Sequence, residues 1–178
     1  EMRVEPVLGT ELPVVVHRAR ALHEVLAASV EHGDRTYIAT ADSRITFAEH
    51  ARRVSSIARA LREEHGVEPG DRVAIAGANT PAWIEAFWAI VSIGGIAVGF
   101  NAWWSPAELA YGVEHATPRL VVADAKRAAA LEGVDVPVVP METRLAEMAT
   151  AYPDAELPSA EVAEDDPAVI LYTSGTSG

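Results

Sequence analysis

Apolar residues recur along the chain at spacings that predict helices alternating with short strands. The clearest helix is predicted after Thr46, where Ala51, Val54 and Leu61 share one face and arginines occupy the opposite face. Short apolar runs without polar interruption predict buried strands between the helices. Helices are predicted at 19–30, 47–61, 81–91, 106–114, 125–131 and 144–150. Strands are predicted at 36–40, 72–76, 96–98, 120–123, 136–139 and 168–172.

Two capping boxes mark the starts of predicted helices. In each box, a hydroxyl side chain and a glutamate three residues later satisfy each other's free backbone N–H groups. Thr46 and Glu49 form the first pair, and Ser105 and Glu108 form the second. Residues 153–167, which are rich in proline and acids, are predicted to form a solvated linker rather than a further element.

This alternation of strands and helices predicts an α/β fold, in which a mainly parallel sheet carries helices on both faces. Ligands of such open sheets bind beyond the carboxyl ends of the strands. The last predicted strand runs directly into a loop of glycines and hydroxyl residues, which are Thr173, Ser174, Gly175, Thr176, Ser177 and Gly178. Glycines let the backbone approach an anion closely, and N–H groups and hydroxyls can then converge on a polyphosphate. Because the loop lacks the lysine spacing of a Walker A motif, its chemistry alone leaves an ordinary surface turn as the alternative.

Composition and charge exclude several classes of protein and site. The 178 residues suit one domain or the front part of a larger one, and their apolar content is that of a globular chain. Acids outnumber bases 26 to 14, for a formal net charge of −12, so no nucleic-acid partner is expected. The chain has no cysteine, which fits the reducing cytoplasm predicted as its location. Its six histidines include no pair at metal-ligand spacing, and no metal-ligating residue is predicted.

One uncharged stretch, 86–107, is long enough on paper to span a bilayer. The glycine pair Gly94-Gly95 and the polar residue Asn101 favour a core helix, a turn and a buried strand instead, so no transmembrane segment is predicted. The pair Trp103-Trp104 leaves three alternatives open: core packing, which is favoured, the border of an acyl entrance, or peripheral contact with a membrane surface.

Four ordered stretches resemble the adenylate-forming (AMP-binding) superfamily, which holds acyl-CoA ligases, luciferases and the adenylation domains of peptide synthetases. Residues 170–178 resemble its phosphate-binding signature, and Asp166-Pro167-Ala168 resembles the lead-in to that signature. Residues 45–49 are similar to the family's early threonine–aromatic–glutamate helix start. Residues 67–75 and 92–101 are similar to its P-G-D-x-V and A-G-A-x-x-x-P-x-N segments. Together these stretches cover nearly the whole chain.

The resemblance implies an ATP-dependent acid–thiol ligase of the acyl-CoA synthetase type. A carboxylate, here a fatty or other apolar acid, would attack the α-phosphate of ATP to form an acyl-adenylate, and coenzyme A would then displace AMP. Mg²⁺ would share the phosphate charge. By match of position, the residues that bind the β- and γ-phosphates would be Thr173, Ser174, Gly175, Thr176, Ser177 and Gly178, with Thr173 and Thr176 as the main hydroxyl donors. Departures at Ser92-Ile93 and Gly99-Phe100 leave the subfamily open, although fatty or medium-chain acyl-CoA ligases are nearest.

The resemblance also implies that residues 1–178 form only the N-terminal part of the AMP-binding (adenylation) domain and end at the phosphate-binding loop. The family's lysine after this loop, its later adenine and ribose motifs and its C-terminal domain are absent from the chain. We therefore expect no catalytic residue within the chain and no adenylation by the chain alone. A non-catalytic truncated homologue that acts as a binding or assembly module, and an unrelated nucleotide-binding α/β domain, stay open as alternatives.

Overall fold

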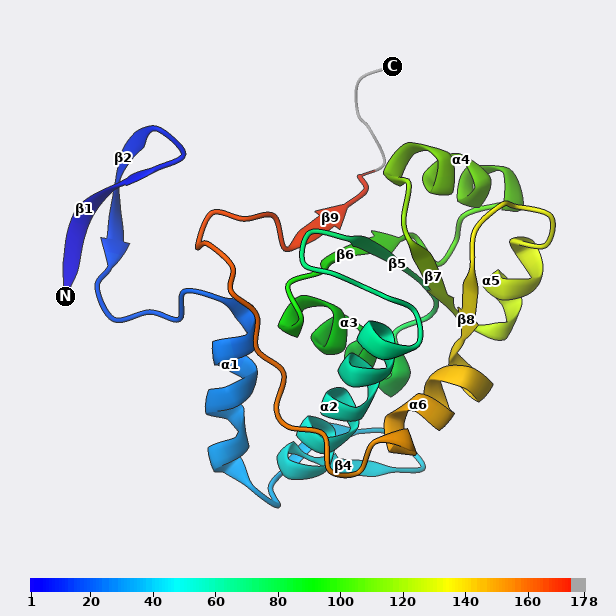
Figure 1. Ribbon diagram of the computed structural model, residues 1–178, viewed down its shortest axis with the longest axis horizontal. Helices are drawn as coiled ribbons and strands as arrows, with labels where there is room; N and C mark the ends of the chain where they lie inside the picture. Colours follow the sequence, from blue (N-terminus) through cyan, green and yellow to red (C-terminus); the bar gives the residue numbers. More distant parts are fainter. Residues whose placement is uncertain (174–178) are drawn as a thin grey trace.

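A five-stranded parallel sheet forms the centre of the molecule (Figure 1). The computed structural model describes residues 1–173. The strand order is β8-β7-β5-β6-β9, and each neighbouring pair runs parallel. The strands are β5 (Arg72–Ala76), β6 (Ile96–Phe100), β7 (Leu120–Ala123), β8 (Val138–Pro140) and β9 (Val169–Leu171). The prediction of an α/β fold with a parallel sheet is confirmed.

Helices cover both faces of this sheet, as the sequence predicted. One face packs against α1, α2, α3 and α6, and the opposite face packs against α4 and α5 (Figure 1). The helices are α1 (Leu22–Ser29), α2 (Phe47–Glu63), α3 (Pro81–Ser92), α4 (Pro106–Ala116), α5 (Ala125–Ala130) and α6 (Ala146–Ala151). A 3₁₀ turn (Val30–His32) follows α1, and a π-helical turn (Met141–Leu145) leads into α6.

Two apolar cores, one on each face of the sheet, explain why its strands read as uninterrupted apolar runs. Along β5, Val73 and Ile75 belong to the core shared with α2 and α3, whereas Ala74 and Ala76 belong to the core under α4. All four side chains are at most 1% exposed. Successive residues of a strand point to opposite faces, so a strand that is buried on both sides needs an apolar residue at every position.

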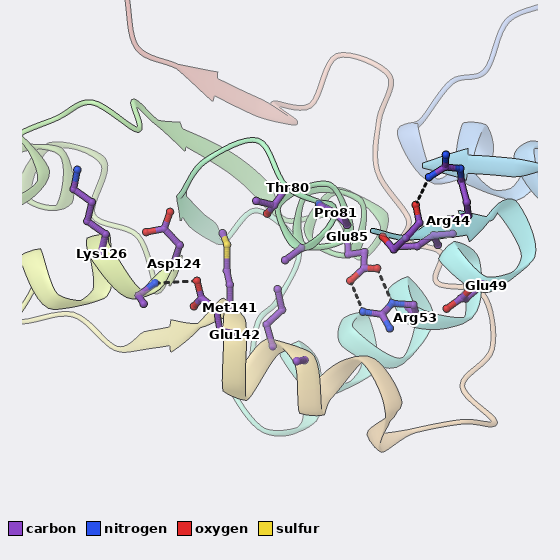
Figure 2. Close-up of a pocket in the computed structure, with 16 residues that line it drawn as sticks. Arg44, Glu49, Arg53, Thr80, Pro81, Glu85, Asp124, Lys126, Met141 and Glu142 are labelled. Atoms are coloured by element: carbon purple, nitrogen blue, oxygen red, sulfur yellow. Dashed lines mark hydrogen bonds and ion pairs between the residues drawn. The ribbon is translucent and has the colours of Figure 1, made fainter. Parts of the chain in front are cut away.

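The two predicted capping boxes differ in the structure. Ser105 and Glu108 form the complete reciprocal pair at the start of α4, where Glu108 Oε2 accepts from Ser105 N at 2.7 Å. At the start of α2, Thr46 Oγ1 accepts from Glu49 N at 3.1 Å, which is half of the predicted box. The Glu49 carboxylate turns instead into a cavity beside α2 (Figure 2), so the reciprocal bond predicted there is wrong.

Two antiparallel hairpins precede the sheet. The first, β1 (Met2–Val7) with β2 (Thr10–Val15), was not predicted, and it stands away from the body of the molecule in Figure 1. In the second, β3 (Thr36–Ala39) pairs with β4 (Arg44–Thr46), and β3 agrees with the strand predicted at 36–40. The first hairpin is tied to the rest of the chain by Arg18, which pairs with both Glu5 on β1 and Glu164.

The segment 153–167 forms no helix or strand, as predicted, but it is not simply solvated. Pro158 is buried in the structure. Ala160 and Val162 press against Gly94, where a Cβ would meet each of them at 3.1 Å. Gly94 also has φ +80°, which a glycine adopts without strain. The segment therefore packs along the turn between α3 and β6.

The uncharged stretch is divided between α3, β6 and the start of α4. Ala86, Ala89 and Ile90 of α3 are fully buried against the sheet. Within the part of the chain that the structure describes, no helix is both long and apolar enough to cross a bilayer.

Candidate functional site

The carboxyl ends of β5, β6 and β9 meet around a cavity of about 500 Å³. Its walls come from the segments that follow these strands, and it is lined by Gly77, Ala78, Asn79, Trp83, Gly99, Phe100, Asn101, Ala102, Trp103, Arg127, Leu171 and Tyr172. This edge of a parallel sheet is where α/β proteins bind ligands. The predicted phosphate-binding residues follow directly on this wall, because Thr173 comes after Tyr172.

Thr173 is the one predicted site residue that the structure describes. It follows β9 immediately and is exposed to solvent. Ser174, Gly175, Thr176, Ser177 and Gly178 lie outside the described residues. The structure therefore places the start of the predicted phosphate-binding loop at the carboxyl edge of the sheet, beside β6.

An aromatic cluster supports the chain where it leaves β9. The Trp104 ring lies 4.9 Å from the Tyr172 ring and 5.3 Å from the Phe100 ring. The prediction of core packing for the tryptophan pair is right for Trp104 and wrong for Trp103, whose side chain is 88% exposed. Adjacent residues in the turn after β6 thus point in opposite directions, and only one of them reaches the core under α4.

An ion pair that sequence reasoning missed joins the loops after three strands. The Asp124 carboxylate, which caps α5, accepts from Ala78 N at 3.1 Å and from Arg127 Nη1 at 2.8 Å. Arg127 Nη2 donates to the carbonyl oxygen of Ala102. Ala78 follows β5, Ala102 follows β6 and Asp124 follows β7, so the pair fixes these strand ends relative to one another. The carboxylate after a buried strand was the available signal, but the contacts of Asp124 with Ala78 and of Arg127 with Ala102 could not be predicted.

The comparisons with known proteins agree with this geometry. The sequence model of the family described as AMP-binding enzyme matches residues 26–178. The chain belongs to this AMP-binding enzyme family. It is 34% identical over 155 residues to a medium/long-chain-fatty-acid–CoA ligase, FadD17 of Mycobacterium marinum, covering 87% of this chain and 30% of that protein. It is 33% identical to a feruloyl-CoA synthase of Amycolatopsis, covering 85% of this chain and 28% of that protein.

Solved structures of adenylate-forming enzymes share the fold. An anthranilate CoA ligase, AuaEII, superposes with a TM-score of 0.80 at 22% identity, covering 89% of this chain and 32% of that one. The N-terminal domain of FACL13 from Mycobacterium tuberculosis superposes with a TM-score of 0.77 at 23% identity, covering 90% of this chain and 42% of that one. The chain spans 30% of the length of FadD17 and 28% of the length of the feruloyl-CoA synthase.

A second cavity, of about 700 Å³, opens between the ends of β5 and β7 (Figure 2). These neighbouring strands continue into α3 and α5, which lie on opposite faces of the sheet. Such a divergence leaves a crevice at the carboxyl ends of the two strands. Figure 2 shows Asp124 and Lys126 on one side of this crevice and Arg53 and Glu85 on the other.

An ion pair between the buried Glu85 and the partly exposed Arg53 forms one wall of this second cavity. Arg53 Nε lies 2.6 Å from Glu85 Oε1, and Arg53 Nη2 lies 3.1 Å from Glu85 Oε2. The Glu85 side chain is 2% exposed, and its hydrogen bonds raise the pKa of Arg53 above the ordinary value. Met141 and Leu145 supply an apolar floor nearby. Because Glu85 has little access to water, Arg53 is what compensates its charge.

Proposed function

We propose that the enzyme containing this chain is an ATP-dependent acid–thiol ligase that forms an acyl-adenylate and passes the acyl group to coenzyme A. One observation carries the proposal: a glycine and hydroxyl segment begins at the carboxyl end of β9 in a chain whose family match spans residues 26–178. The named relatives add support, since FadD17, the feruloyl-CoA synthase and a hydroxybenzoate–CoA ligase of Thauera aromatica all join carboxylic acids to coenzyme A.

In the proposed reaction, the loop holds ATP while the carboxylate reacts. Backbone N–H groups of residues 173–178 and the hydroxyls of Thr173 and Thr176 bind the β- and γ-phosphates of the substrate MgATP. A carboxylate oxygen attacks the α-phosphorus, and the bond to the bridging oxygen breaks to release pyrophosphate. The thiolate of coenzyme A then attacks the acyl carbon, and AMP leaves. The loop contributes by positioning ATP and by stabilising the charge that collects on the departing pyrophosphate.

We also propose how this chain fits into the enzyme and which class of acid the enzyme uses. Residues 1–178 would form the N-terminal part of the adenylation domain, and catalytic residues would lie in the longer enzyme outside this chain. The acid would be a fatty or other apolar carboxylate, for which the relationship to FadD17 is the support. We place the enzyme in the cytoplasm, where ATP and coenzyme A are available to it.

The test is carboxylate-dependent exchange of labelled pyrophosphate into ATP by the longer enzyme, with acids of graded chain length. Thr173→Ala and Thr176→Ala should each lower kcat/KM for ATP by about 10- to 100-fold, because each removes a hydrogen bond to a charged phosphate. Thr10→Ala, which removes an exposed hydroxyl on β2, is the matched control and should exchange like the wild type.

Two results would contradict the proposal. One is an exchange rate that is unchanged in the Thr173→Ala, Thr176→Ala double variant. The other is full exchange activity from residues 1–178 alone, which would show that the chain already holds the catalytic residues.

A further inference from the structure

Tyr172, the residue before the predicted phosphate-binding loop, contacts a side chain of the distant helix α4. Its hydroxyl lies 2.9 Å from Nδ1 of His115 on α4, although the two residues are 57 positions apart. Tyr111, one turn earlier on α4, stacks on the His115 ring at 5.5 Å with an interplanar angle of 13°. His115 is therefore held by a stacked ring on one face of its imidazole as well as by the hydrogen bond at Nδ1.

The other edge of the Tyr172 ring packs against the end of β6. Trp104 meets the ring edge-on at 4.9 Å, and Phe100 does so at 5.9 Å. We call these five residues the aromatic anchor: Phe100, Trp104, Tyr111, His115 and Tyr172. Helix α4 approaches the anchor closely at Gly112, where a Cβ would lie 2.7 Å from the Trp104 ring. A side chain at that position would force the anchor to shift.

Within residues 1–173, the sheet pairing of β9 does not extend past Leu171. β9 is the edge strand of the sheet, and its pairing with β6 ends at Leu171 opposite Gly99. Tyr172 and Thr173 belong to no regular element. The aromatic anchor thus holds Tyr172, the residue that follows the last paired position of β9.

We propose that His115 is a positioning residue, which acts through the Tyr172 hydroxyl to hold the start of the phosphate-binding loop in the geometry that binds MgATP. This inference rests on the proposed function of the loop. A hydrogen bond joins the Tyr172 hydroxyl to Nδ1 of His115, and burial raises the pKa of Tyr172 above its ordinary value. A tyrosine that only filled space would need no such partner for its hydroxyl.

Four variants of the longer enzyme separate positioning from simple packing. Tyr172→Phe removes the hydroxyl and keeps the ring, and His115→Leu removes the hydrogen-bonding partner of that hydroxyl. His115→Asn restores a hydrogen-bonding group close to the place of Nδ1. Glu114→Leu makes the matched change at an exposed neighbouring position on α4 and is the control.

The measurement is the Kd for MgATP by titration calorimetry without carboxylate, together with the thermal unfolding midpoint of each variant. We expect Tyr172→Phe and His115→Leu each to raise the Kd by about 3- to 10-fold, as the loss of one hydrogen bond would do. The double variant should bind no more weakly than either single variant, because both lose the same bond. His115→Asn and Glu114→Leu should bind MgATP like the wild type.

Two outcomes distinguish the inference from the function on which it rests. If the wild type binds MgATP and both single variants bind it equally well, the positioning role is overturned and the proposed function is unaffected. If the wild type itself binds no MgATP, the proposed function fails and the inference falls with it.

Discussion

Replacing Arg53 by leucine is expected to lower the free energy of unfolding by about 3 to 5 kcal/mol. Glu85 is 2% exposed and has both carboxylate oxygens bound by Arg53 (Figure 2). Without Arg53 the carboxylate is left as an uncompensated charge beside the apolar core. Urea-induced unfolding at neutral pH measures the loss.

A neighbouring arginine provides the matched control. Arg52 is exposed on α2, and its replacement by leucine should change the unfolding free energy by no more than about 0.5 kcal/mol. The double variant Arg53→Leu, Glu85→Leu should recover much of the lost stability, since apolar residues can replace a buried ion pair with little cost. An Arg53→Leu variant as stable as Arg52→Leu would show that the pair is not the sole compensation of the Glu85 charge.

Lowering the pH from 7 to 4 is expected to reduce the free energy of unfolding by about 3 kcal/mol through the titration of His50 alone. This residue of α2 is 1% exposed and packs 4.6 Å from the Tyr37 ring. Burial, with a smaller contribution from the Arg53 charge, lowers the pKa of His50 from 6.5 to about 4. Above pH 6.5 the ring is neutral in both the folded and the unfolded chain. Between pH 6.5 and 4 only the unfolded chain takes up the proton, so stability falls as the pH falls through this window.

The share of His50 is obtained by comparing unfolding free energies at pH 7 and pH 4. His50→Leu should lose about 3 kcal/mol less than the wild type over this interval, because it has no imidazole to protonate. His17→Leu removes an exposed histidine and should keep the full decline. Equal declines for His50→Leu and the wild type would mean that His50 is protonated in the folded protein at the same pH as in the unfolded chain.

Much of the fold could be predicted because its determinants are local. Residues 73–76 of β5 and residues 120–123 of β7 are apolar at every position, as burial on both faces requires. The start of α4 follows from Ser105 and Glu108, which satisfy each other's backbone N–H groups. The first hairpin escaped prediction because Pro6 and Pro13 interrupt its pattern and its attachment depends on Arg18 contacting Glu164.

Two of the features that were missed depend on pairs that are distant in the sequence. Arg53 and Glu85 are separated by 32 positions, and a glutamate in a helix is normally solvated. The available signal was that Glu85 is the sole charge within 81–93. Trp103 and Trp104 are residues of the same type, but the turn after β6 exposes Trp103 to solvent and packs Trp104 against Tyr172. The sequence located the glycine and hydroxyl loop, whereas its support by His115 required the structure.

Formation of an acyl-adenylate is tested most directly by tracing an oxygen atom from the carboxylic acid to the nucleotide. The longer enzyme is given MgATP, coenzyme A and a carboxylate labelled with ¹⁸O, and the products are analysed by mass spectrometry. Formation of an acyl-adenylate predicts AMP and pyrophosphate as products, with one ¹⁸O atom in the phosphate of AMP. Release of ADP and phosphate, or of AMP without label, would contradict it.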